Sequence, residues 1–147
     1  VKGFNHPLGR SSVTFFGVED LARRHGPGFP RSLDGAPLLI PYGSAAAHGF
    51  LGRWFDAHAI HPQVVGEFDD TALMKTFGQA GLGIFPAPSV MRDEVRRLYD
   101  VEVVGEAADI DMRYYAISAE RRLKHPAVMA VSEHARQDLL VEDPRSA

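Results

Sequence analysis

Apolar runs of strand length alternate with stretches of helical spacing through the middle of the chain. The runs typical of strands are Pro37–Ile40, Gln63–Phe68, Gly81–Phe85 and Val101–Val104. The stretches with apolar side chains every three or four residues are residues 44–60, 70–80 and 89–100. Four strands separated by three helices, with short loops, predict an α/β fold with a mostly parallel sheet of the Rossmann or flavodoxin kind.

The segments on either side of this alternation follow a different pattern. Val13–Phe16 and residues 112–119 are rich in β-branched and aromatic side chains and indicate strands, and Pro126 suits the first position of a final helix. Prolines and glycines at residues 25–30 interrupt regular structure. We expect three parts: an incoming segment and crossover at residues 1–35, an α/β unit at residues 36–110, and a return strand with a C-terminal helix at residues 111–147.

Composition narrows the range of functions. The 147 residues carry sixteen Lys and Arg against nineteen Asp and Glu, and this net charge of −3 disfavours direct binding of a phosphate backbone. The absence of cysteine excludes disulfides and thiolate chemistry and fits a reducing compartment, so we expect the cytoplasm. No apolar run reaches the ~18 residues of a membrane span, and no signal-peptide pattern follows Lys2. Because the first residue is not Met, we expect a piece of a longer protein.

The candidate functional residues lie where strands give way to helices. At Tyr42-Gly43-Ser44, the glycine permits a tight turn, Ser44 can cap the following helix, and free backbone N–H groups can face a ligand. Ligands of open parallel sheets bind at this carboxyl edge. An ordinary helix cap without a ligand explains the same residues, so both interpretations stay open.

An acidic junction follows the next strand. Glu67, Asp69 and Asp70 place three carboxylates within four residues. Asp69 or Asp70 suits a helix cap, where the helix dipole favours negative charge. The alternative is a site for a hard cation such as Na⁺, Mg²⁺ or Ca²⁺, which takes oxygen ligands. The spacing matches no EF-hand loop.

A third junction contains two prolines. Pro86-Ala87-Pro88 is predicted as a stiff loop on the same edge of the sheet. The preceding Gly81-Leu-Gly-Ile-Phe-Pro86 departs from a dinucleotide fingerprint, because its glycines precede the strand and Pro86 replaces the third glycine. Nucleotide binding is therefore rejected.

Catalytic and metal chemistry find no support. The seven histidines lack the spacing of a metal site, and neither G-x-S-x-G nor S-x-x-K occurs. We expect no catalytic residues, no metal site and no cofactor.

Beyond these patterns, one block of the sequence resembles a known family. Residues 66–78, Gly-Glu-Phe-Asp-Asp-Thr-Ala-Leu-Met-Lys-Thr-Phe-Gly, are very similar to the effector-domain segment of NhaR-type activators, a branch of the LysR-type transcriptional regulators. Pro37–Pro41, Gly81–Pro86 and Ala119–Val128 fall in the expected order and at fitting distances. The resemblance covers nearly the whole chain.

The resemblance implies a two-lobed effector domain similar to a type 2 periplasmic binding protein. Residues 36–110 would form its second lobe, while residues 1–35 would end the first lobe and cross over, and residues 111–147 would return to it. DNA would be contacted only through an N-terminal helix-turn-helix that this chain lacks. The resemblance also implies a homo-oligomer, either a dimer or a tetramer.

The resemblance further implies an effector, a small molecule or a cation such as sodium, in the cleft between the lobes. The residues it points to are Tyr42, Gly43, Ser44, Asp69, Asp70, Thr71, Pro86, Ala87 and Pro88. The alternative is a solute-binding protein of the periplasmic-binding type, which shares this architecture. A hydrolase or transferase on a flavodoxin-like sheet is a weaker alternative, because no nucleophile–base pair supports it.

Overall fold

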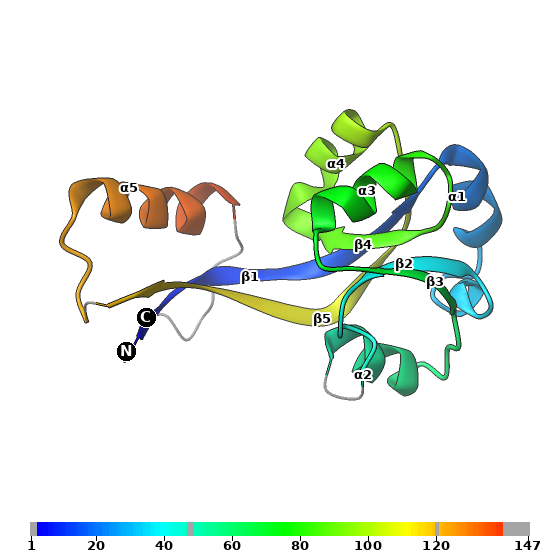
Figure 1. Ribbon diagram of the computed structural model, residues 1–147, viewed down its shortest axis with the longest axis horizontal. Helices are drawn as coiled ribbons and strands as arrows, with labels where there is room; N and C mark the ends of the chain where they lie inside the picture. Colours follow the sequence, from blue (N-terminus) through cyan, green and yellow to red (C-terminus); the bar gives the residue numbers. More distant parts are fainter. Residues whose placement is uncertain (1–2, 47–48, 120, 140–147) are drawn as a thin grey trace.

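The computed structural model describes residues 3–46, 49–119 and 121–139 (Figure 1). Its strands are β1 (Phe4–Gly17), β2 (Pro37–Pro41), β3 (Gln63–Phe68), β4 (Phe85–Pro88) and β5 (Glu102–Ser118). Its helices are α1 (Glu19–His25), α2 (Phe50–Ala57), α3 (Thr71–Gln79), α4 (Arg92–Tyr99) and α5 (Pro126–His134), with a π-helical turn at Ala135–Leu139. The predicted α/β alternation after residue 36 is confirmed.

The strands pair in two hydrogen-bonded sheets. β2 and β3 are parallel, whereas β1 lies between β4 and β5 and runs antiparallel to both. An isolated parallel bridge between Leu38 and Ile84 joins the two sheets. The predicted mostly parallel sheet is not confirmed, since the larger sheet is antiparallel. β1 precedes the alternating region, so no helical crossover forces it to run in the direction of its neighbours.

Helices cover both faces of the joined sheets. One buried cluster, with Phe15 and Leu38, packs against α1 and α2. A second, with Phe16 and Leu39, packs against α3 and α4, and Figure 1 shows these two helices on the side of the strands opposite α2. Adjacent residues belong to different clusters because successive side chains of a strand point to opposite faces. Within this unit β2, β4 and the last residues of β1 are therefore buried on both sides, whereas β3 is largely exposed.

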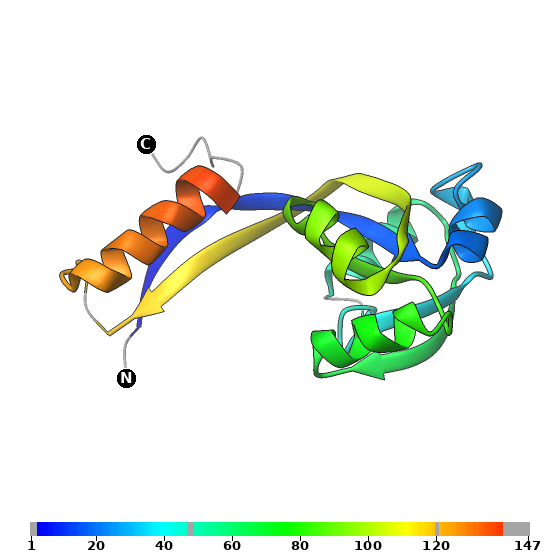
Figure 2. The same cartoon turned by 90° about the horizontal axis from the view of Figure 1, so that it is seen from above.

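Beyond this unit, β1 and β5 continue as a two-stranded antiparallel ribbon. Opposite Ser12, residues 108–111 of β5 bulge out of the pairing register. The ribbon leads away from the α/β unit, and α5 lies along it (Figure 2). Nε of Arg136 donates a hydrogen bond of 3.0 Å to the Pro7 carbonyl, which ties the π-helical turn after α5 to the ribbon.

Several elements differ from their predicted bounds. The helix predicted over residues 44–60 begins at Phe50, because residues 42–45 form turns; residues 47–48 lie outside the described part. The strands predicted at residues 101–104 and 112–119 are one continuous strand, β5. Antiparallel pairing with β1 extends along both halves of β5, and the bulge at residues 108–111 lies between them.

The prolines of β4 do not form the predicted loop. Pro86 and Pro88 lie within the strand, in register with Phe15 and Val13 of β1. Proline cannot donate to a strand ladder, so it is confined mainly to edge strands. β4 is the edge strand of the three-stranded sheet, and this position accommodates both prolines.

Candidate functional site

A cavity of about 390 Å³ opens beside α3, at the carboxyl ends of β2 and β4. Its lining residues are Val13, Pro41, Phe50, Thr71, Lys75, Pro86, Ala87, Pro88, Met91 and Met112. Val13 and Met112 belong to β1 and β5, the two strands that leave the α/β unit. The cavity therefore lies at the junction between that unit and the ribbon.

The structure brings part of the predicted site together here. Thr71 and the three residues of Pro86–Pro88 line the cavity. The remaining predicted residues, Tyr42, Gly43, Ser44, Asp69 and Asp70, are not among its lining residues. The Tyr42 side chain is 73% exposed and points to solvent rather than into a packed wall.

Ser44 has a structural role that differs from the predicted side-chain cap. Its hydroxyl donates to the Pro41 carbonyl at 2.6 Å, and the residue is buried. Its own carbonyl accepts the backbone N–H groups of Leu51 and Gly52 at 3.1 and 3.0 Å. The backbone of Ser44, not its side chain, thus satisfies amides at the start of α2.

Asp70 is the N-cap of α3. Its Oδ1 accepts the backbone N–H groups of Ala72 at 2.8 Å and Leu73 at 3.4 Å. This contact supports the capping interpretation of the acidic junction. Among the described residues, no group of three or more His, Asp or Glu side chains could hold a metal ion.

Lys75 was not predicted as a site residue, although the sequence carried a signal for it. It follows Thr71 by four residues on α3, and positions i and i+4 share one face of a helix. Gly78 allows this helix to approach β4, because a Cβ there would collide with the Phe85 ring. No sequence pattern marks Phe50 or Met112, since both reach the cavity from distant parts of the chain.

The wall at Pro88 and Met91 is held to β1 by hydroxyl groups. Ser89 Oγ lies 2.7 Å from Ser12 Oγ and 2.8 Å from Thr14 Oγ1. The backbone N–H of Val90 donates to Ser11 Oγ at 3.3 Å. Ser11 and Thr14 are buried, and their hydroxyl groups tie this wall to β1.

Arg92 and Glu106 form an ion pair next to the wall at Pro88 and Met91. Arg92 donates to Glu106 at 2.5 Å, and Ser12 donates to the same carboxylate at 2.7 Å. The hydrogen bonds from Ser12 and Arg92 hold the pKa of Glu106 below its ordinary value, against the opposing effect of partial burial. The Glu106 carboxylate is thus already bound by Ser12 and Arg92, and Glu106 is not among the residues that line the cavity.

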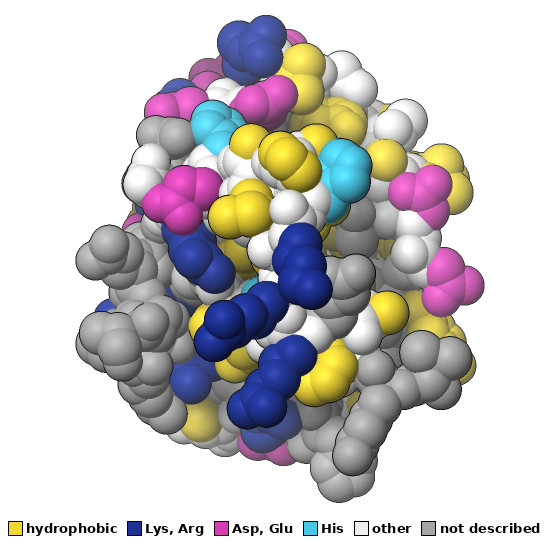
Figure 3. Space-filling model, turned by 90° about the vertical axis from the view of Figure 1, so that its left-hand side faces the viewer, with side chains coloured by type: hydrophobic (Ala, Val, Ile, Leu, Met, Phe, Trp, Pro, Cys, Tyr) yellow, Lys and Arg dark blue, Asp and Glu magenta, His cyan; other side chains and the backbone are white. Residues whose placement is uncertain are grey.

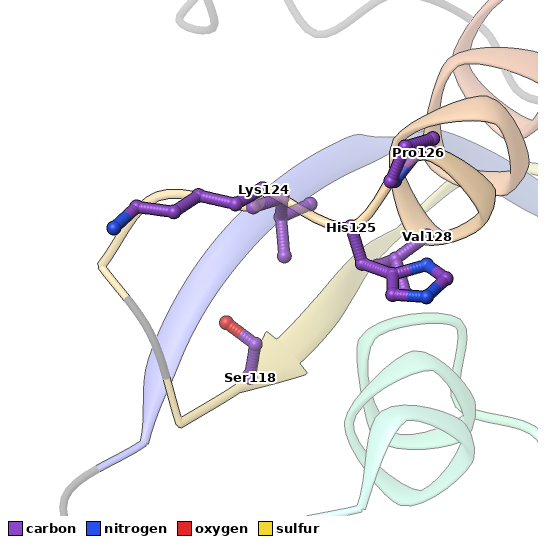
Figure 4. Close-up of a pocket in the computed structure, with 6 residues that line it drawn as sticks. Ser118, Lys124, His125, Pro126 and Val128 are labelled. Carbon is purple, nitrogen blue, oxygen red and sulfur yellow. The ribbon is translucent and has the colours of Figure 1, made fainter.

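A second cavity, of about 470 Å³, lies between the end of β5 and the start of α5 (Figure 4). Its polar groups are already engaged or turned aside: His125 Nδ1 accepts the Ala127 N–H at 3.3 Å as the cap of α5, and Lys124 extends away from His125. Figure 3 shows Lys and Arg side chains gathered on this end of the molecule, where Arg121 and Arg122 line a further cavity. None of the predicted site residues lies here.

Comparison with known proteins decides which kind of domain carries this cavity. The family model of the LysR substrate binding domain matches residues 5–140. The chain belongs to this LysR family. It is therefore the effector-binding regulatory domain of a LysR-type transcriptional regulator. This family is non-enzymatic, which confirms the prediction that the chain is not an enzyme, and it sets aside the solute-binding alternative.

The curated relatives place this LysR domain near one branch. It is 36% identical over 103 residues to the transcriptional activator protein NhaR of Escherichia coli (strain K12), and equally to NhaR of Shigella flexneri. The match covers 70% of this chain and 34% of each relative, so the chain spans about a third of their length.

Solved structures show the same fold. The effector domain of AmpR of Pseudomonas aeruginosa superimposes with a TM-score of 0.68 at 19% identity, over 93% of this chain and 66% of that one. The CcmR regulatory domain of Synechocystis PCC6803 in complex with 2-PG gives 0.68 at 13% identity, over 96% and 70%. The effector binding domain of QuiR in complex with shikimate gives 0.65 at 16%, over 93% and 65%. These identities support the fold alone.

No helix in the described ranges is long and apolar enough to cross a membrane.

Proposed function

We propose that this chain binds the small effector of a cytoplasmic LysR-type transcriptional activator similar to NhaR, in the cavity between α3 and β4. The observation that carries the proposal is the cavity itself, which is mostly apolar with a few polar groups. It opens at the carboxyl ends of strands, where α/β sheets bind ligands. The solved QuiR and CcmR domains, complexed with shikimate and 2-PG, support a small molecule as the effector class.

In the proposed effector site the three predicted loops have different roles: some residues contact the effector and others hold helices in place. Thr71 and Pro86–Pro88 contact the effector directly. Asp70 holds the start of α3 in place, and Ser44 does the same for α2. Tyr42, Gly43 and Asp69 lie outside the cavity lining, so in this proposal they contact the effector only when a first lobe closes over them.

In this proposal residues 36–110 form the second lobe, and residues 1–35 and 111–147 connect it to the first. Exposed apolar side chains on the ribbon and α5 support this division, since Ile117 is 74% exposed and Val131 is 70% exposed. These two side chains leave apolar surface that another protein segment can cover. DNA is bound by a helix-turn-helix outside this chain, in agreement with its net charge of −3.

Regulation follows from differential binding. The cavity takes Val13 from β1 and Met112 from β5, and both strands lead into the ribbon. An effector that touches these two residues and α3 together favours one angle between the lobes. Only this difference in affinity between two arrangements can change the spacing of the distant DNA-binding segments.

The complete regulator acts as a homo-oligomer in this proposal, and β3 offers a surface for the second copy. β3 is an edge strand that exposes Val64 and Val65, and Leu73 is exposed on the adjacent α3. Open strand edges with apolar side chains favour association. Val65→Glu is expected to shift the complete regulator toward smaller species in light scattering, whereas Gln63→Glu on the same strand leaves the oligomer unchanged.

The experiment that tests the effector site is a thermal-stability screen of the complete regulator against small metabolites, Na⁺ and pH. A ligand of the folded state at a hundred times its Kd stabilises it by about 2.7 kcal/mol, which raises the melting temperature measurably. Thr71→Trp fills the cavity from an exposed position and is expected to abolish the shift. Thr76→Trp, exposed on the same helix but outside the lining, is expected to retain it. A shift that survives Thr71→Trp places the effector elsewhere.

A further inference from the structure

One cationic side chain lines the effector cavity. Lys75 is half-buried, and among the residues that the structure describes it has no ion-pair or hydrogen-bond partner. No carboxylate appears among the lining residues. A partly desolvated ammonium group without a counter-charge is unfavourable, and a bound anion relieves this cost.

We propose that the cavity takes a small organic acid with an apolar body, and that the Lys75 ammonium pairs with its acid group. This inference rests on the proposed function of the cavity as the effector site. Thr71 lies one helical turn before Lys75 on the same face of α3, so its hydroxyl donates a hydrogen bond to the same acid group. Lys75 is then the residue that selects anionic over neutral effectors.

The amides of α3 do not supply the positive charge in place of Lys75. Asp70 already accepts the N–H groups of Ala72 and Leu73, and its carboxylate offsets the positive end of the helix dipole. An anion in the cavity therefore depends on the lysine side chain.

The residues that line the cavity do not suit a cation. Sodium and other hard cations need several oxygen ligands, often carboxylates. Asp70 is occupied as a cap, while Glu67 and Asp69 are exposed and lie outside the lining. Within the cavity a cation would meet the Lys75 charge, which repels it.

The rest of the lining suits an apolar body. Phe50, Met91, Met112 and Val13 face the cavity together with three prolines. Methionine side chains adapt to irregular apolar ligands. The volume of about 390 Å³ lies within the range of roughly 300–1,000 Å³ usual for small-molecule sites.

A matched pair of fluorescent probes tests the proposal in the complete regulator. 8-Anilinonaphthalene-1-sulfonate combines an apolar body with an anionic group, and N-phenyl-1-naphthylamine has the same body without the sulfonate. Lys75→Met is expected to weaken binding of the sulfonate about tenfold, the size of one charge-assisted hydrogen bond, and to leave the neutral probe unchanged. Lys75→Arg keeps the charge and is expected to restore binding.

The controls separate this proposal from the effector site itself. Lys124→Met removes the same charge from an exposed position far from the cavity and is expected to change neither probe. If Thr71→Trp abolishes binding of both probes but Lys75→Met changes neither, the anion assignment is wrong and the effector site stands. If Thr71→Trp also changes neither, or no probe binds, the cavity is not a ligand site and both proposals are overturned. Stabilisation by NaCl over choline chloride that Thr71→Trp removes overturns the anion assignment in favour of a cation.

Discussion

The α/β unit and the distal ribbon share two strands but are held together differently. In the unit, Phe15 of β1 is completely buried and stacks on Trp54 with ring centroids 5.5 Å apart. The ribbon is formed by the same two strands, but there Ile117 of β5 is 74% exposed. Val131 of α5, the helix along the ribbon, is 70% exposed. Figure 2 shows helices around the strands of the unit but only α5 along the ribbon.

This difference shows that pairing alone does not bury a strand. A two-stranded ribbon needs a further strand or a packed helix to be stable by itself, and α5 covers only part of this ribbon. The stability of the chain is therefore concentrated in the α/β unit, while the ribbon presents a face that another segment can cover.

The largest effect is expected from a truncation inside the unit. Phe15→Ala removes a fully buried ring that contacts both Phe29 and Trp54, and it should lower the free energy of unfolding by about 3–5 kcal/mol. Ile117→Ala in the ribbon should change it by less than about 0.5 kcal/mol. Denaturant unfolding followed by the fluorescence of Trp54, the single tryptophan, measures both. Equal losses for the two variants would contradict a concentration of stability in the unit.

The sequence predicted the unit better than the ribbon for a physical reason. Strands buried on both faces, such as Leu38 and its neighbours, form short apolar runs that end at turns, and these are visible locally. The direction of β1 and the continuity of β5 depend on pairing between residues that are 85 to 114 positions apart in the chain. Pro126 was predicted correctly as the start of the last helix, but Val128 and Val131 of that helix are exposed in this chain.

The cavity shows the same division. Thr71 and Pro86–Pro88 could be predicted because each follows or ends a strand on one edge of the sheet. Lys75 could have been found from its helical spacing to Thr71. Met112 could not, because it reaches the cavity only through the antiparallel pairing of β5 with β1.

The second prediction asks whether the ribbon face is covered in the complete regulator. Val131→Lys places a charge on the exposed side of α5, and in the 147-residue chain it should change stability by less than about 0.5 kcal/mol. In the complete regulator a covering first lobe would desolvate that charge, and the cost should rise to about 1–3 kcal/mol. Thermal unfolding of both proteins with and without the substitution measures the difference. The same small effect in both would show that the face stays open.

The third prediction concerns the acidic junction at the edge of the unit. Asp70→Ala removes two hydrogen bonds to the first turn of α3 and should cost about 1 kcal/mol. Asp69→Ala, next to it and exposed, should cost close to nothing. If the role of Asp70 is capping, the effector response of the complete regulator survives this loss of stability. A response abolished without loss of stability would instead make Asp70 an effector ligand.

The smallest effect is a pH dependence at the boundary between the two regions. Asp109, in the bulge of β5, accepts hydrogen bonds from His58 Nε2 at 2.7 Å and Trp54 Nε1 at 2.8 Å, and so links α2 to the bulge. Partial burial raises the pKa of Asp109, but these hydrogen bonds outweigh it and lower the pKa below its ordinary value. The carboxylate therefore stabilises the fold above the unfolded pKa of about 3.9, and this contribution is lost as the pH falls through the lower, folded value.

Asp109→Asn isolates that contribution, because the amide keeps the shape and removes the charge. The side chain is 56% exposed, so solvent screening limits the loss at pH 5 to about 0.5 kcal/mol or less. Between pH 5 and pH 2.5, as the Asp109 carboxylate becomes protonated, the stability gap between the two proteins should close. A gap that stays constant over this range would mean that the link between α2 and the bulge does not depend on the charge of Asp109. The boundary between unit and ribbon would then be held by packing alone.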